Sequence, residues 1–182
     1  MKNPTMSALG FLAAAMLVFQ AVAPLLPAAT VTWDTAPGTV GAGDSLITGG
    51  TGTWDPSNPA NGNWTVDAGV NNIAWSNAGI DTAVFGGASG TVTLASGATV
   101  GGLTFNDNAG YVLTGSTITL GAAGIITANV GAQIDSLLNA ASFGLTFAGA
   151  GNLTVSNAIA NGSTLTKNNA GTVTLTGSNA FT

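Results

Sequence analysis

Reactive side chains are scarce in this chain of 182 residues, and this scarcity limits the chemistry that it can perform. The sequence contains no His, Cys, Glu or Arg. It therefore offers no imidazole base, no thiol, no guanidinium clamp and no glutamic acid for proton transfer. Aspartates, hydroxyl groups, one tyrosine and two lysines remain. We predict from this set that the protein is not an enzyme.

Two aspartates come nearest to a catalytic arrangement. Glycoside hydrolysis uses two carboxyl groups about 5–9 Å apart, one of them with a raised pKa. Asp107 and Asp135 could approach each other only across one structural repeat, and no Arg or Lys beside them marks a sugar-binding groove. A polysaccharide-degrading enzyme is kept only as an alternative, and we predict no catalytic, cofactor-binding or metal site.

Two short stretches contain oxygen ligands of the kind that calcium prefers. Residues 40–46 include Gly-Ala-Gly-Asp-Ser, which is similar to the glycine-aspartate repeat that binds calcium in some solenoids, and residues 106–108 read Asn-Asp-Asn. The first kind of site needs stacked copies, whereas this copy is single. Asx turns use the same residues as the second without a metal. We therefore interpret both stretches as turns.

All four tryptophans lie between residues 31 and 85. Tryptophan rings stack on sugars, so Trp54, Trp64 and Trp75 provide another alternative, a carbohydrate-binding module. Large aromatic side chains also pack well over the end of a hydrophobic column. We favour packing and interpret residues 30–85 as a Trp-rich N-terminal cap, because the first coil of a solenoid must cover its strand edge.

A near-repeat of glycine followed by alternating aliphatic residues and threonine organises the second half of the chain. Its copies begin at Gly90, Gly110, Gly131, Gly151 and Gly171, which lie 20, 21, 20 and 20 residues apart. Alternation of this kind is typical of strands with one face turned inward. Each inward Val, Leu or Phe stabilises the fold by roughly 1.5–3 kcal/mol on full burial. The copy at 110–114 breaks the alternation and predicts a one-residue slip or a bulge.

A second series, at 102–105, 124–127, 144–147 and 163–166, has the same period and is offset by about half of it. A fixed period of this size indicates one unit stacked on copies of itself. We predict an all-β fold, a right-handed parallel β-helix with about 20 residues per coil over residues 86–182. An antiparallel sandwich is the alternative, but it does not explain why the same pentapeptide returns every second strand.

The first 29 residues have the layout of a secretory signal peptide. Lys2 precedes an apolar run at 9–23, which is followed by prolines and small residues. A retained membrane anchor is the alternative, although the run is short for a bilayer span. Cleavage would leave one Lys and seven Asp, a net charge of −6. No basic patch can then form, so nucleic acid is excluded as a partner and anionic membranes are disfavoured.

Residues 165–182 resemble the autotransporter-associated β-strand repeat, whose pattern is approximately Leu-x-Lys-x-Gly-x-Gly-Thr-Leu-Thr-Leu-x-Gly-x-Asn-x-Tyr-Thr. Asn169 replaces a glycine, Val173 a leucine and Phe181 the tyrosine. The segments at 52–55, 63–64, 75–79, 83–87 and 101–105 look like the leader that precedes such repeats. The positions that match the repeat are Leu165, Lys167, Gly171, Thr172, Thr174, Leu175, Gly177, Asn179 and Thr182.

This resemblance implies the passenger region of an autotransporter-type protein. Such a region would be an exported structural or adhesive shaft at the cell surface, secreted or displayed at the outer membrane. Its implied partners are the outer-membrane translocation machinery and glycans or proteins of a host or environmental surface, with no small-molecule cofactor. Because the chain ends within the motif, we expect it to be the N-terminal part of a longer protein.

Overall fold

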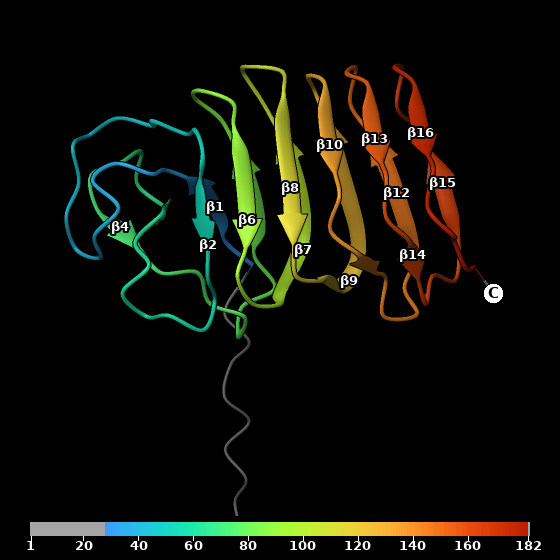
Figure 1. The fold of residues 1–182 in the computed structure, drawn as a ribbon, viewed down its shortest axis with the longest axis horizontal. Helices are drawn as coiled ribbons and strands as arrows, with labels where there is room; N and C mark the ends of the chain where they lie inside the picture. Colours follow the sequence, from blue (N-terminus) through green and yellow to red (C-terminus); the bar gives the residue numbers. More distant parts are fainter. Residues whose placement is uncertain (1–27, 182) are drawn as a thin grey trace, which may run out of the picture.

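The computed structural model describes residues 28–181, so the predicted signal peptide, residues 1–29, lies outside the described residues except for its last two positions. The described chain is all-β and forms a rod of stacked coils (Figure 1). None of its segments forms a helix long and apolar enough to cross a membrane. The strands of the described residues are β1 (Thr30–Trp33), β2 (Gly52–Trp54), β3 (Trp64–Thr65), β4 (Asn72–Ile73), β5 (Thr82–Phe85), β6 (Thr91–Leu94), β7 (Ala98–Phe105), β8 (Tyr111–Gly115), β9 (Ile118–Ala128), β10 (Ala132–Ile134), β11 (Leu138–Asn139), β12 (Leu145–Ala148), β13 (Leu153–Val155), β14 (Ile159–Ala160), β15 (Leu165–Lys167) and β16 (Val173–Leu175).

Parallel pairing between successive coils builds the rod. One sheet has the order β2-β6-β8-β10-β13-β16, and all its pairs are parallel. From β6 onward the paired residues lie 20 or 21 positions apart, as for Val92 with Leu113 and Val155 with Leu175. The predicted parallel β-solenoid with about twenty residues per coil is confirmed, and the antiparallel sandwich is wrong. The right-handed turn of the coils stays a prediction.

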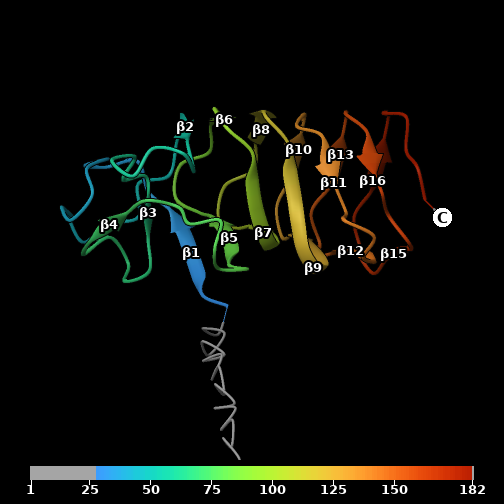
Figure 2. The same ribbon diagram turned by 90° about the horizontal axis from the view of Figure 1, so that it is seen from below.

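The second sheet supplies two strand runs to each coil. In β9, Ile118 and Thr119 pair with β11, whereas residues 124–127 pair with β12. The division continues into the next coil, because β11 pairs with β14 and β12 pairs with β15. Figure 2 shows β7 and β9 lying side by side along this part of the rod. Three runs per coil therefore enclose the interior.

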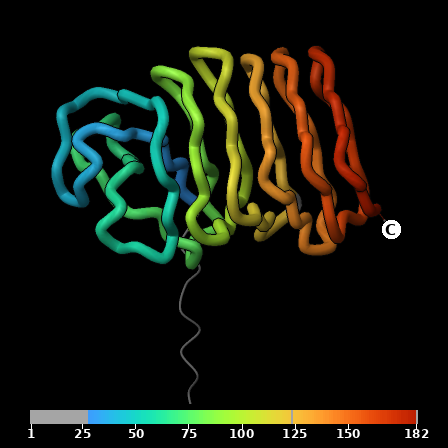
Figure 3. Tube along the Cα trace, viewed as in Figure 1, coloured from blue at the N-terminus to red at the C-terminus, as the bar shows by residue number. Residues whose placement is uncertain are grey.

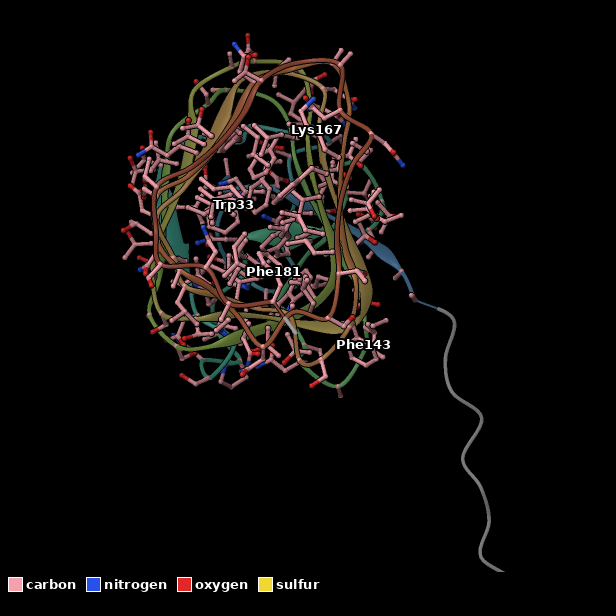
Figure 4. The ribbon with its side chains drawn as sticks, turned by 90° about the vertical axis from the view of Figure 1, so that its right-hand side faces the viewer. Trp33, Phe143, Lys167 and Phe181 are labelled. Carbon is pink, nitrogen blue, oxygen red and sulfur yellow. The ribbon has the colours of Figure 1, made fainter. Side chains whose placement is uncertain are left out.

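Inward aliphatic side chains form continuous columns inside these walls. Val92, Leu113, Ile134, Val155 and Leu175 stand in register from coil to coil. The first four are fully buried, and Leu175 packs against them partly buried. Figure 4, a view along the rod, shows side chains filling the space between the strands. Burial of this apolar surface is the main stabilising contribution that the repeat provides.

Two irregularities interrupt the regular stacking. In β8, Val112 pairs with Thr91, 21 positions earlier, although the glycines that begin the two repeats are only 20 residues apart. The strand is therefore shifted by one residue, and Tyr111 and Leu113 face inward. The predicted one-residue slip at 110–114 is confirmed. The other irregularity was not predicted: Val100 pairs with Leu120 but Gly102 pairs with Ile125, so β9 contains extra residues opposite β7.

The N-terminal region departs from the repeat. β1 pairs in parallel with β5 on one side but antiparallel with β3 on the other, and β3 continues antiparallel to β4. The loop of residues 38–46 lies beside β4, since Gly41 donates a hydrogen bond to the Asn72 carbonyl and the Asn72 N–H donates to Ala42. Figure 3 shows these segments at the end of the rod opposite the C-terminus. The domain boundary near residue 85 stays a prediction.

Candidate functional site

The four tryptophans form one buried cluster at the N-terminal end. Trp33, Trp54 and Trp64 are fully buried and Trp75 is 4% exposed. The ring centroids of Trp64 lie 5.1, 4.8 and 4.7 Å from those of Trp33, Trp54 and Trp75. Figure 4 places Trp33 inside the walls of the coil. A sugar cannot stack on rings that are covered on both faces, so Trp54, Trp64 and Trp75 provide no carbohydrate platform in this fold.

Tyr111 is a structural residue that the sequence analysis missed. Its side chain is fully buried at the first position of β8 and packs 5.5 Å from Phe85 between ring centroids. The hydroxyl donates a hydrogen bond to the Gly86 carbonyl at 2.6 Å and accepts one from the Gly50 N–H at 3.2 Å. Burial raises the pKa of the Tyr111 phenol above its ordinary value. One side chain thereby joins three segments distant in sequence.

The two aspartates considered for hydrolysis lie in different turns of the coil. Asp107 follows β7, and its Oδ2 accepts a hydrogen bond from the Gly87 N–H at 3.1 Å. Asp135 follows β10 in the other sheet, where its Oδ1 accepts hydrogen bonds from Gln133 and Ser156. Asp107 thus bonds to the turn of the preceding coil and Asp135 to Ser156 of the following coil, and the structure does not assemble them into an acid–base pair.

The polar side chains of the two stretches considered for calcium form hydrogen bonds with their own loop or with a neighbouring coil. Asp44 accepts a hydrogen bond from the Leu46 N–H within its own loop. Asn106 accepts one from the Asn129 amide of the next coil at 2.7 Å, and the Asn108 amide donates to the Gly87 carbonyl at the same distance. No group of three or more acidic, His or Cys residues able to hold a metal occurs in the part of the chain that the structure describes.

Lys167 lies in residues 165–182, the segment that resembles the autotransporter-associated repeat, and it contacts the residues that directly follow it. Its Nζ donates to the Asn169 carbonyl at 2.6 Å. The side chain of Asn169 is buried and donates to the carbonyls of Ala148 and Gly151 in the preceding coil. Asn169 therefore adds hydrogen bonds between coils, and Lys167, the last residue of β15, stabilises the turn that follows its strand.

A shallow depression of about 340 Å³ lies on the outer face of the first sheet, where β8, β10 and β13 begin. Gly110 and Gly131 form part of its wall, and Gln133, Asn152 and Thr154 supply its polar groups. It contains no carboxylate or amine, and the Asn152 Oδ1 already accepts a hydrogen bond from the Thr172 N–H. Its neutral side chains can offer hydrogen bonds to a ligand.

The chain is similar to the protein named "Adhesin BmaC autotransporter" from Brucella suis biovar 1 (strain 1330), with 45% identity over 121 residues. The aligned segment covers 64% of this chain and 3% of that protein, so the chain spans only a small part of its relative. No family model matches the chain, and no solved structure matches it. The similarity relates the aligned part of the chain to a protein named as an autotransporter adhesin.

Proposed function

We propose that this chain is part of the passenger region of an autotransporter-type surface protein and acts there as a non-catalytic, adhesive shaft. The combination that carries the proposal is a parallel β-solenoid together with 45% identity to a protein named as an adhesin autotransporter. The fold is an elongated stack of coils, and the name of the relative indicates a role in adhesion. We assign residues 165–182 to the autotransporter-associated repeat because of the residues of this segment that match its pattern.

Mechanically, a shaft of this kind works through stacking. Each coil covers the apolar columns of its neighbour and forms main-chain hydrogen bonds with it, so the rod needs no separate globular core. Outward positions of the strands are rich in threonine, which keeps the surface polar. Residues 30–85 cover the first coil as a cap, because the antiparallel β3 and β4 and the loop at 38–46 lie over its edge.

Other features of the sequence support export and surface exposure. The predicted signal peptide would direct the chain across the inner membrane, and the outer-membrane translocation machinery would be its next partner. A mature charge of −6 with a single Lys is compatible with a solvated surface protein. Glycans or proteins of a host or environmental surface are the proposed adhesion targets.

Surface display tests this proposal. The chain, with its own signal peptide, is fused to a C-terminal autotransporter barrel and expressed in a Gram-negative host. We expect antibodies to label the chain on intact cells, and we expect these cells to adhere to cultured epithelial cells more than cells that display the barrel alone. Retention of the chain inside the cell would contradict the passenger assignment, and display without added adherence would contradict the adhesive role.

A parallel assay addresses the enzymatic alternative. The purified chain is incubated with a panel of polysaccharides, and the release of reducing ends is measured. We expect no release, because Asp107 and Asp135 lie in separate turns. Release that is lost in Asp107→Asn or Asp135→Asn, but kept in Asp81→Asn, would replace the shaft proposal with an enzymatic one.

A further inference from the structure

Four exposed aliphatic side chains occur on two loops at the N-terminal end of the rod. Leu46 is 65% exposed, Val66 57%, Val70 54% and Val40 44%. We call this set the N-terminal apolar patch. Single exposed aliphatic residues are common on protein surfaces, whereas several together mark an interaction site. The four side chains can form one patch only where the two loops lie side by side.

Main-chain hydrogen bonds connect the two loops along their length. Ser45 donates to the Gly69 carbonyl at 2.9 Å, and Gly41 donates to the Asn72 carbonyl at 2.7 Å. Gly43 approaches the main chain of Val70 so closely that a Cβ there would collide with the Val70 carbonyl. Figure 1 shows β4 and the chain around it at the end of the rod opposite β16.

The turn that bears Val66 and Val70 is held in place by Asp67. Its Oδ1 accepts hydrogen bonds from the Thr65 hydroxyl at 2.7 Å and from the Asn71 N–H at 2.9 Å. Its Oδ2 accepts one from the Asn71 side-chain amide at 2.8 Å. The aliphatic side chains on either side of Asp67 are therefore presented by an ordered turn, which lowers the entropy lost when a partner binds.

The negative charge around the patch favours a cationic partner over a second copy of the chain or an anionic lipid surface. Residues 30–85 contain five Asp and no Lys or Arg, and two of these aspartates, Asp44 and Asp67, belong to the same two loops as the patch. A second copy of the chain would place like charges against each other, and an anionic lipid surface would be repelled in the same way. A cationic partner is attracted and steered toward the patch.

We propose that the N-terminal apolar patch binds a protein surface on which exposed aliphatic or aromatic side chains are bordered by Lys or Arg. Leu46 and Val70 supply the apolar contact, and Asp44 supplies the complementary charge. The site lies on the loops at the end of the rod and uses none of the coil surface. This inference goes beyond the proposed function and does not depend on the export route, because purified protein suffices to test it.

Binding of a defined peptide by the whole purified chain tests the proposal. The probe is a fluorescently labelled peptide of alternating Lys and Leu, and its anisotropy is measured as protein is added. Peptides of alternating Glu and Leu or of Lys and Ser are the comparisons, because each keeps only one of the two required features. We expect only the Lys and Leu peptide to bind. Equal binding of either comparison peptide would overturn the proposal.

Matched variants locate the site. We expect the double variant Leu46→Ser, Val70→Ser to weaken binding by roughly tenfold or more, and Asp44→Asn to weaken it several-fold. Ile125→Ser removes an aliphatic residue that is 51% exposed on the shaft, and Asp135→Asn removes a distant charge; both controls should bind like the unaltered chain. Loss of binding in the controls to the same extent would overturn the proposal, as would unchanged binding in the double variant.

Two further measurements test whether a second copy of the chain or a lipid surface binds the patch instead. Sedimentation of the unaltered chain should show a monomer, and neutral phosphatidylcholine vesicles should not retain it. A dimer or vesicle binding that is lost in the Leu46→Ser, Val70→Ser variant would assign the patch to self-association or to lipid and would overturn the proposal. Circular dichroism of each variant verifies that it is folded, and the exposed positions of Leu46 and Val70 make folding of the double variant the expected result.

Discussion

At the scale of single residues, the most important polar contacts connect distant segments and perform no chemistry. The Tyr111 hydroxyl joins Gly86 to Gly50, and the Trp33 Nε1 donates to the Gly50 carbonyl at 2.9 Å. Both side chains are fully buried. A buried polar group contributes most when its partners would otherwise be left without a hydrogen bond. The loop around Gly50 is therefore fixed to the first coils by two aromatic side chains.

Removal of the Tyr111 hydroxyl should measure this contribution. We expect Tyr111→Phe to lower the free energy of unfolding by about 1–2 kcal/mol, because the buried Gly86 carbonyl loses its donor. Urea titration followed by tryptophan fluorescence gives the value. Thr91→Val, which removes an exposed hydroxyl from β6, serves as the control and should change stability by less than about 0.5 kcal/mol. Equal effects of the two substitutions would contradict the proposed role of Tyr111.

Turn aspartates should make stability depend on acid pH. The Ser57 and Ser96 hydroxyls lower the pKa of Asp55, and the side chain and N–H of Asn71 together with Thr65 lower that of Asp67. A carboxylate whose pKa is lower in the folded chain stabilises the fold above its unfolded pKa, near 3.8, and this stabilisation is lost as the pH falls through the folded pKa.

We therefore expect the midpoint of thermal unfolding to fall below pH 4. Asp55→Asn and Asp67→Asn should each flatten this dependence when the midpoint is measured across an acid series. Thr91→Val, which changes an exposed residue of β6 and keeps every carboxylate, is the comparison and should keep the slope of the unaltered chain. An unaltered chain with the same midpoint at pH 3 and pH 7 would show that these turns do not contribute.

At the scale of elements, the parity of each strand decides which side chains are structural. Ile134 in β10 is fully buried between Leu113 and Val155, whereas Ile125 in β9 faces outward and is 51% exposed. The two residues are chemically identical and lie on neighbouring coils. Their different burial follows only from the face of the sheet to which each position points.

This pair provides a matched test of the columns. We expect Ile134→Ala to destabilise the chain by about 2–5 kcal/mol, because it removes transfer free energy and leaves a cavity between two coils. Ile125→Ala should cost less than about 0.5 kcal/mol. Denaturant unfolding of the two variants supplies both values. A cost at Ile125 equal to that at Ile134 would be incompatible with the inward column.

At the scale of the whole molecule, packing and main-chain hydrogen bonds must supply the stability. The chain has no Cys, so disulfides are excluded. The carboxylates at the calcium-like stretches are engaged in turns, as with Asp44 and Leu46. Stacked coils contact mainly their neighbours, so stability accumulates coil by coil.

We accordingly expect divalent metal to have no effect on folding. The midpoint of thermal unfolding should be the same in excess EDTA and in millimolar calcium. Magnesium at the same concentration controls for the general effect of a divalent salt. A midpoint raised by calcium but not by magnesium would indicate a specific calcium site and would correct the interpretation of residues 40–46.

The sequence alone was sufficient to predict the period, the parallel stacking and the inward positions. Val92, Leu94, Val155 and Leu175 could be assigned to one face because strands alternate strictly, and because an equal spacing repeats the same face in every coil. The slip at Tyr111 was visible as a break in that alternation. These properties are local or periodic, so the order of apolar and polar residues along the sequence is enough to predict them.

Only the tertiary structure decided the features that depend on contacts between segments without a period. Leu138–Asn139 and Ile159–Ala160 are too short to show alternation, and they become strands because the coils beside them supply hydrogen-bond partners. The burial of Trp64, the contacts of the Tyr111 hydroxyl and the exposure of Leu46 each depend on how the chain between β2 and β5 folds over the first coil. The physical reason is that burial is set by which segments meet in space, and irregular loops carry no sequence period that specifies their partners.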